Sequence, residues 1–131
     1  MKILIVDDDP ISRLTMSTTL KSYGQCDCAE HGQDGLARFA AALDSGEPFD
    51  LVFMDIQMPV MDGHTALAAI REVERARRVV PGSEAKAIMI TCHDDVKNVS
   101  ESFFHGEASG YFTKPIDLRA MVARLKQDGL L

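Results

Sequence analysis

The chain has 131 residues, 46% of them hydrophobic and 26% charged, which is typical of one soluble globular domain. Its net charge of −6 argues against direct binding of nucleic acid, because a phosphate backbone requires clustered cations. The N-terminal run MKILIVDDD is too short in apolar residues for a signal peptide, and no segment is long enough to cross a bilayer. Three cysteines without a disulfide spacing predict free thiols in a reducing compartment, so we expect a cytoplasmic protein.

Short apolar runs alternate along the chain with segments of helical periodicity. The runs predict buried strands at Ile3–Val6, Gln25–Ala29, Leu51–Met54, Ala87–Ile90 and Tyr111–Phe112. Apolar residues three or four positions apart predict helices around Leu36–Leu43, Ala66–Val73, Val96–Phe103 and Leu118–Leu125. A first helix is expected to begin after Asp9 as its N-cap, with Pro10 at its first position, and to stop at Gly24.

This repeated alternation of strand and helix predicts the fold class. Near-continuous apolar strands separated by helices indicate an α/β fold, with a parallel sheet covered by helices on both faces. Right-handed crossover connections restrict the topology further. The sequence shows no internal repeat, low-complexity tract or linker, so we expect residues 1–131 to form a single domain without an output domain.

Polar side chains follow four of the five predicted strands. In an open parallel sheet the ligand site lies beyond the carboxyl ends of the strands, so these side chains are expected at one edge. They are Asp7, Asp8 and Asp9 after the first strand, Asp55 after the third, Thr91 after the fourth and Lys114 after the fifth. We interpret Asp9 as a helix cap rather than a ligand.

Carboxylates gathered in this way need a counter-charge. Two of them about 5 Å apart repel by about 3 kcal/mol at an effective dielectric constant of about 20. A divalent cation removes this repulsion, and an all-oxygen site with few protein ligands suits Mg²⁺. The cation would also screen an incoming phosphoryl group, while Lys114 and Thr91 hold its other oxygens. The residue types therefore fit phosphoryl transfer to a carboxylate.

The stretches ILIVDDDP, LVFMDIQMPVMDG, IMITCHDD and ASGYFTKPI resemble the response-regulator receiver domains of two-component signalling. The similarity covers essentially the whole chain. It implies a flavodoxin-like, doubly wound (βα)5 fold with five parallel strands in the order 2-1-3-4-5, of which the chemotaxis regulator is a known example. It also implies a cis bond between Lys114 and Pro115, whereas an X-Pro bond considered alone favours trans.

The resemblance also implies a role for the acidic residues at the sheet edge. Asp55 is the implied phosphoacceptor, which forms an aspartyl phosphate. Asp8 and Asp55 are implied ligands of Mg²⁺, and the main-chain carbonyl of Gln57 is a third. Asp7 is implied to act on the cation through water.

The remaining polar residues are implied to handle the phosphoryl group. Lys114 pairs with the active-site carboxylate and then with the phosphoryl group, and Thr91 with Tyr111 forms the switch pair. Gln57 and His93 occupy positions that vary in the family. We hypothesise that this pair tunes the rate of dephosphorylation by ordering or blocking the attacking water.

Such a domain is a signalling switch that receives its phosphoryl group from a histidine kinase or a phosphotransfer protein. It is not an enzyme beyond its own phosphorylation and dephosphorylation. The face built from the fourth helix, the fifth strand and the fifth helix is implied to change its partners. The downstream protein target is left open, as is the choice between a monomer and a phosphorylation-dependent dimer, and we expect no membrane partner.

Two other functions compete with this interpretation. A haloacid-dehalogenase-type phosphatase would use Asp7 as nucleophile and Asp9 as a second acid, but that family carries a cap or a larger core for which this chain has no length. A receiver-like interaction module that accepts no phosphate is disfavoured by the complete set of acids, Thr91 and Lys114.

Two further motifs receive structural interpretations. Cys26, Cys28 and His31 form a C-x-C-x2-H pattern, but a fourth zinc ligand is not evident in the sequence. The stretch Arg71–Arg78 (REVERARR) mixes charges at helical spacing. We interpret it as a solvated helix face rather than a nucleic-acid patch.

Overall fold

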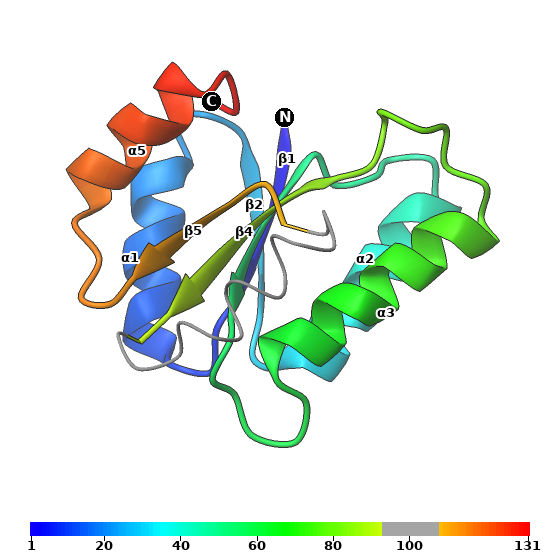
Figure 1. The fold of residues 1–131 in the computed structure, drawn as a ribbon, viewed down its shortest axis with the longest axis horizontal. Coiled ribbons are helices and arrows are strands. Elements are labelled where there is room, and N and C mark those ends of the chain that lie inside the picture. The colour runs from blue at the N-terminus through cyan, green and yellow to red at the C-terminus, as the bar shows by residue number, and fades with distance from the viewer. Residues whose placement is uncertain (93–107) are drawn as a thin grey trace.

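A five-stranded parallel sheet forms the centre of the fold. The computed structural model describes residues 1–92 and 108–131. The strands are β1 (Lys2–Val6), β2 (Gln25–Ala29), β3 (Leu51–Asp55), β4 (Lys86–Thr91) and β5 (Gly110–Thr113), in the order β2-β1-β3-β4-β5 (Figure 1). All four neighbouring pairs are parallel, so the predicted fold class and strand order are confirmed.

The strand register brings the carboxyl ends of the central strands to one edge. Val6 at the end of β1 pairs with Met54, and Asp55 at the end of β3 pairs with Ile90. The predicted strand positions are confirmed, but Asp55 and Thr91 are the last residues of their strands rather than the first residues beyond them. The sheet therefore holds both residues directly, which fixes them better than a loop would.

The described residues contain four helices: α1 (Pro10–Leu20), α2 (Gly32–Asp44), α3 (Gly63–Ala76) and α5 (Leu118–Gln127). Each begins at a side chain that accepts a hydrogen bond from the first turn, where N–H groups lack partners within the helix. The capping residues are Asp9, His31, Asp62 and Asp117. Within the described ranges, no helix combines the length and apolar character that crossing a bilayer requires. The helix predicted around Val96–Phe103 lies outside those ranges.

The start of α1 agrees with the sequence, but its end does not. Asp9 is the N-cap and Pro10 the first helical residue, as predicted. The helix ends at Leu20, so Gly24 is not its stop signal. A Cβ on Gly24 would lie 2.4 Å from the carbonyl oxygen of Met1, so this glycine is needed for a close backbone approach instead.

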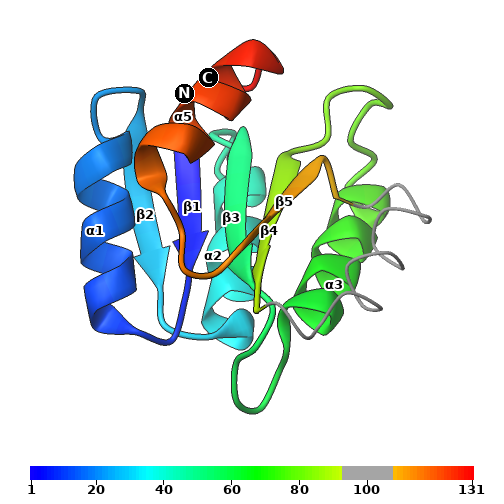
Figure 2. The same cartoon turned by 60° about the vertical axis from the view of Figure 1, so that its left-hand side comes forward.

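The helices cover both faces of the sheet, with α1 and α5 on one face and α2 and α3 on the other (Figures 1 and 2). Successive side chains of a strand point to opposite faces, so the central strands supply both cores. The core under α1 and α5 includes Ile3, Ile5, Met16, Leu20, Phe53, Met121 and Leu125. The core under α2 and α3 includes Leu4, Val6, Phe39, Val52, Met54, Leu67 and Ile70. Every residue of β3 is buried between these cores, which makes the end of that strand a rigid support.

A buried ion pair lies on α3, inside the stretch that the sequence suggested to be solvated. Arg71 Nη1 donates to Glu74 Oε1 at 2.6 Å, and the two side chains are 12% and 4% exposed. Arg71 also donates to the carbonyl of Ala85 at 2.9 Å, and Glu74 Oε2 accepts from the Ala85 N–H at 2.8 Å. The pair ties α3 to the residue before β4. The solvated interpretation is wrong for these two residues, because periodicity does not reveal which segment folds over a helix.

We expect Glu74→Ala to lower the free energy of unfolding by about 3 kcal/mol, because it removes the buried acceptor of Arg71 and Ala85. Urea denaturation followed by circular dichroism measures this loss. The matched control is Glu72→Ala, which removes an exposed carboxylate paired with Arg75 and should change the value by about 0.5 kcal/mol or less. Equal losses in the two variants would contradict a structural role of the buried pair.

Candidate functional site

Three predicted site residues meet at the carboxyl edge of the sheet. The carboxylate oxygens of Asp7, Asp8 and Asp55 lie within 4.8 Å of one another, and in the described part of the chain this is the one group of acidic, histidine or cysteine ligands with metal-binding spacing. Asp7 is 4% exposed and Asp55 is 1% exposed, whereas Asp8 is open to solvent. The cluster therefore has two buried carboxylates and one accessible side.

Among the described residues, one ammonium group reaches this cluster, from the end of β5. Lys114 Nζ donates to Asp55 Oδ2 at 3.1 Å. Partial burial alone would lower the pKa of Lys114, but the carboxylates of Asp55 and Asp7 outweigh it and raise that pKa. Lys114 thus stays charged and offsets part of the negative charge at this edge.

The pKa values of both buried carboxylates are raised. Burial, and then the charge of Asp7, raise the pKa of Asp55 to about 6, although Lys114 and the Gln57 N–H counteract the shift. Burial is also the main cause that raises the pKa of Asp7. Three acidic groups near one ammonium leave the site short of positive charge. An all-oxygen donor set with excess negative charge fits a hard divalent cation such as Mg²⁺.

Backbone hydrogen bonds orient the two buried acids. Asp7 Oδ1 accepts from the Asp9 N–H at 2.9 Å, and Asp55 Oδ1 accepts from the Gln57 N–H at 3.2 Å. Arg13 Nη1 donates to the main-chain carbonyl of Asp7 at 2.7 Å, which ties the end of β1 to α1. The sequence reasoning missed Arg13. Its position one helical turn after the Asp9 cap was the available signal.

Asp9 itself does not join the cluster of Asp7, Asp8 and Asp55. Its side chain accepts from the Ile11 N–H at 3.1 Å and from Ser12 Oγ at 3.0 Å. The interpretation of Asp9 as a helix cap is therefore confirmed.

Thr91 lies beside the cluster on the neighbouring strand. It is 1% exposed and follows Ile90, the residue that pairs with Asp55. Its hydroxyl donates to the carbonyl of Cys92 at 3.2 Å, and its own carbonyl accepts from the Lys114 N–H at 2.7 Å. The ends of β4 and β5 are thus joined at the site, and the Lys114–Pro115 bond that follows is cis, as the resemblance implied.

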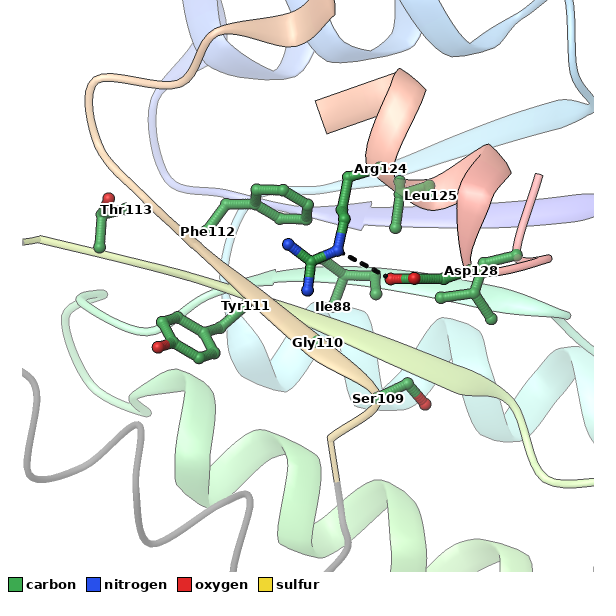
Figure 3. Close-up of a pocket in the computed structure, with 10 residues that line it drawn as sticks. Ile88, Ser109, Gly110, Tyr111, Phe112, Thr113, Arg124, Leu125 and Asp128 are labelled. Atoms are coloured by element: carbon green, nitrogen blue, oxygen red, sulfur yellow. Dashed lines mark hydrogen bonds and ion pairs between the residues drawn. The ribbon is translucent and has the colours of Figure 1, made fainter. Parts of the chain in front are cut away.

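Tyr111 shares a face of the sheet with Thr91. Tyr111 pairs with Met89, which precedes Thr91 by two residues and packs in the core under α2 and α3. Figure 3 shows Tyr111 on the opposite side of β5 from Phe112. The Tyr111 residue is 47% exposed, so about half of its surface is open to solvent.

A hollow of about 230 Å³ opens beside the cluster, between α1 and the segment after β5. It is lined by Asp7, Ile11, Ser12, Thr15, Met16, Ile90, Lys114, Pro115, Ile116 and Leu118. Ile11 and the nearby Leu14 on α1 are 73% and 67% exposed. Apolar side chains open to solvent therefore border the site on the α1 side.

Two other sequence predictions concern residues elsewhere. His31 Nδ1 accepts from the Asp34 N–H at 3.1 Å and caps α2, while Cys26 and Cys28 are partly buried against the core under α1 and α5. These contacts give a structural explanation for the C-x-C-x2-H pattern. His93 lies outside the described residues, and Gln57 is exposed next to Asp55.

The raised pKa of Asp55 predicts a pH-dependent stability in metal-free solution. Its folded pKa of about 6 exceeds the ordinary value of 3.8, so the folded state binds more protons and loses stability as pH rises between these values. We expect Asp55→Asn to match the wild type near pH 4 and to exceed its free energy of unfolding by about 3 kcal/mol near pH 7.

Urea denaturation in the presence of a chelator at a series of pH values measures this difference. Asp128→Asn removes an exposed carboxylate at the C-terminal end of α5, where it pairs with Arg124 in solvent, and should follow the wild-type curve. A constant gap between Asp55→Asn and the wild type across the pH range would contradict the prediction.

Comparison with known proteins identifies the family. Residues 3–126 match the response regulator receiver domain. The sensor histidine kinase GacS of Pseudomonas protegens is 35% identical over 98% of this chain and 13% of its own length. The two-component response regulator ORR41 of Oryza sativa is 39% identical over 54% of this chain and 56% of its own length. The chain thus spans only part of these relatives.

Solved structures of the same fold lead to the same family. The CheX-CheY-BeF3-Mg complex from Borrelia burgdorferi contains a chain with a TM-score of 0.80 at 26% identity, covering 100% of this chain and 90% of that one. Chemotaxis protein CheY4 of Vibrio cholerae has a TM-score of 0.76 at 26% identity, with 96% of each chain covered. The protein therefore belongs to the response regulator receiver domains of two-component signalling.

Proposed function

We propose that this receiver domain is a switch in which Asp55 accepts a phosphoryl group from a phosphohistidine of a histidine kinase or phosphotransfer protein. The observation that carries the proposal is the direct pairing of Lys114 with Asp55, 3.1 Å apart, inside the cluster formed with Asp7 and Asp8. Of the three clustered acids, Asp55 is the one with this cation at its carboxylate oxygen. A lysine already in place can neutralise the product at that position.

The same residues are proposed to hold Mg²⁺. Asp8 and Asp55 would supply carboxylate oxygens, Gln57 its main-chain carbonyl, and Asp7 a contact through water. When bound, the cation neutralises the carboxylates and the oxygens of the incoming phosphoryl group. The Borrelia burgdorferi neighbour, whose complex includes BeF3 and Mg, supports this choice of ion.

In the proposed transfer, an oxygen of the Asp55 carboxylate attacks the phosphorus atom. A phosphorus–oxygen bond forms, the phosphorus–nitrogen bond of the donor breaks, and its electron pair returns to the imidazole ring. The attacking group must be ionised, and a pKa of about 6 leaves Asp55 mainly ionised near neutral pH. Lys114 then exchanges its contact with Asp55 for one with a phosphoryl oxygen, and Thr91 holds another.

The output is proposed to pass from Thr91 to Tyr111. Thr91 would move toward the phosphoryl group, and the exposed Tyr111 ring on the same face of the sheet would turn inward. The face formed by the fourth predicted helix, β5 and α5 would then change its affinity for a protein target or a second copy. Phosphorylation shifts the population only as far as it interacts differently with the two states.

The phosphodonor is proposed to approach over α1. Ile11 and Leu14 expose apolar side chains next to the hollow that Asp7 and Lys114 line. Such side chains lose contact with water when a partner covers them, which also shields the transfer from hydrolysis. The free thiols of Cys26, Cys28 and Cys92 agree with a reducing compartment, so we place this exchange in the cytoplasm.

Incubation with acetyl phosphate and Mg²⁺ tests the phosphoacceptor. We expect the intact mass to rise by one phosphoryl group, and borohydride reduction followed by peptide mapping to place the modification at Asp55. Asp55→Asn should show no gain, and Asp128→Asn, which removes an exposed carboxylate, should behave as the wild type. An acyl phosphate at Asp7 would favour the phosphatase function, and no mass gain in the wild type would favour the interaction module.

The hydrolysis rate of the aspartyl phosphate is proposed to depend on Gln57 and His93. We expect the double replacement of both residues by alanine to change the dephosphorylation rate, because it alters the groups that order or block the attacking water. Loss of phosphoprotein after removal of acetyl phosphate measures the rate. Glu30→Ala, an exposed change after β2, should leave the rate unaltered. An unchanged rate in the double variant would refute the tuning hypothesis.

A further inference from the structure

The first residue of α3 is a glycine that touches the backbone of the phosphoacceptor. A Cβ on Gly63 would lie 2.4 Å from the carbonyl oxygen of Asp55 and 2.7 Å from the Cα of Ile56. Both distances are shorter than any real contact of a Cβ, and both involve backbone atoms that cannot rotate away. The start of α3 therefore lies against the end of β3 as closely as the backbones allow.

Conformational freedom does not explain this glycine. Gly63 is absent from the residues with positive φ among those that the structure describes, so its backbone suits any amino acid. Helix propensity favours alanine over glycine. The close approach to Asp55 is thus the reason that remains for glycine at this position.

Gly63 completes a clamp around the peptide that follows Asp55. The Ile56 N–H donates to the Ile90 carbonyl of β4 at 2.9 Å, and the Ile56 carbonyl accepts from the Gly63 N–H at 2.8 Å. The Asp62 side chain holds the helix start by accepting from the Thr65 N–H at 2.8 Å. The peptide is held by β4 on one side and by α3 on the other.

This peptide connects groups that the proposed chemistry needs at fixed positions relative to one another. It leads from the Asp55 carboxylate, 3.1 Å from Lys114, to the Gln57 N–H that donates to Asp55 Oδ1. The Gln57 carbonyl is the main-chain ligand proposed for Mg²⁺. A displacement at Gly63 would act on the backbone of Asp55 and Ile56, to which these groups are attached.

We propose that Gly63 is a positioning residue of the phosphoryl-transfer site, which sets the Asp55 carboxylate and the Gln57 carbonyl by letting α3 pack on the backbone between them. The inference rests on the proposed function for its chemistry. Its structural part, the effect of Gly63 on the cation-binding groups, stands on the contacts alone.

The test compares Gly63→Ala with Gly24→Ala. A Cβ at either position would lie 2.4 Å from a backbone carbonyl oxygen, but Gly24 contacts Met1 at the amino edge of the sheet, away from the acidic cluster. Both variants should lose stability in urea denaturation. We expect only Gly63→Ala to bind Mg²⁺ about 10-fold more weakly by isothermal titration calorimetry and to react about 100-fold more slowly with acetyl phosphate.

A metal-free readout separates this inference from the proposed function. The Gln57 amide resonance in chelator-treated protein should shift in Gly63→Ala and stay in place in Gly24→Ala. If the wild type accepts no phosphoryl group, the proposed function fails, while Mg²⁺ affinity and the Gln57 resonance still decide the role of Gly63.

Wild-type Mg²⁺ affinity in Gly63→Ala, or an equal loss in both variants, would overturn the proposal. If Gly63→Ala is partly unfolded, the measurements are repeated with the osmolyte trimethylamine oxide, which favours the folded state. Failure to fold under that condition assigns Gly63 to folding in general and also overturns the proposal.

Discussion

The crowding of Asp7, Asp8 and Asp55 around the ammonium of Lys114 is the interaction on which the site depends. At separations of about 5 Å each pair of carboxylates repels by about 3 kcal/mol, and one lysine cannot compensate for three acids. The backbone holds the two buried acids in place, because Asp55 is the last residue of β3 and the Asp7 N–H donates to the Ala29 carbonyl of β2 at 3.2 Å. A proton or a cation can relieve the repulsion. Burial first, and the charge of Asp7 second, raise the pKa of Asp55 and so favour the proton when no cation is bound. Any group that adds or replaces charge at this edge of the sheet therefore changes the electrostatic energy of all three acids and of Lys114.

The fold compensates for this repulsion through the packing of β3, the strand that ends at Asp55. β3 lies between two strands and two helical layers, and all five of its residues are buried. Hydrophobic burial on both faces supplies the stability that the acidic edge lacks. The polar residue of β3, Asp55, is the last residue of the strand. The acidic cluster that it forms there reaches solvent on one side, at Asp8. The acidic cluster therefore combines a rigidly held carboxylate, Asp55, with a side that is accessible from solvent, at Asp8.

Local signals in the sequence predicted much of this arrangement. Apolar runs located the strands, and Asp9 with Pro10 located the start of α1, because these depend on neighbouring residues alone. The convergence of Asp7, Asp55 and Lys114 followed from the rule that parallel strands present their carboxyl ends together. The order 2-1-3-4-5 came from the family resemblance, since a βα alternation by itself allows other orders. The burial of Glu74 and the contact of Gly63 with Asp55 were not predicted, because each depends on a contact across a loop.

The same contacts weigh against the phosphatase interpretation of Asp7 and Asp9. In that reaction a second acid two residues after the nucleophile would have to hold a proton and donate it to the leaving group, which requires a raised pKa. Asp9 has the opposite environment. Hydrogen bonds from Ser12 and from the Ile11 N–H lower its pKa, and the side chain caps α1. Asp55, in contrast, has a pKa raised to about 6 by burial and then by the charge of Asp7, and it is also the clustered acid that Lys114 contacts. Charge, burial and hydrogen bonding therefore favour the end of β3, rather than the end of β1, as the place where a phosphoryl group is received.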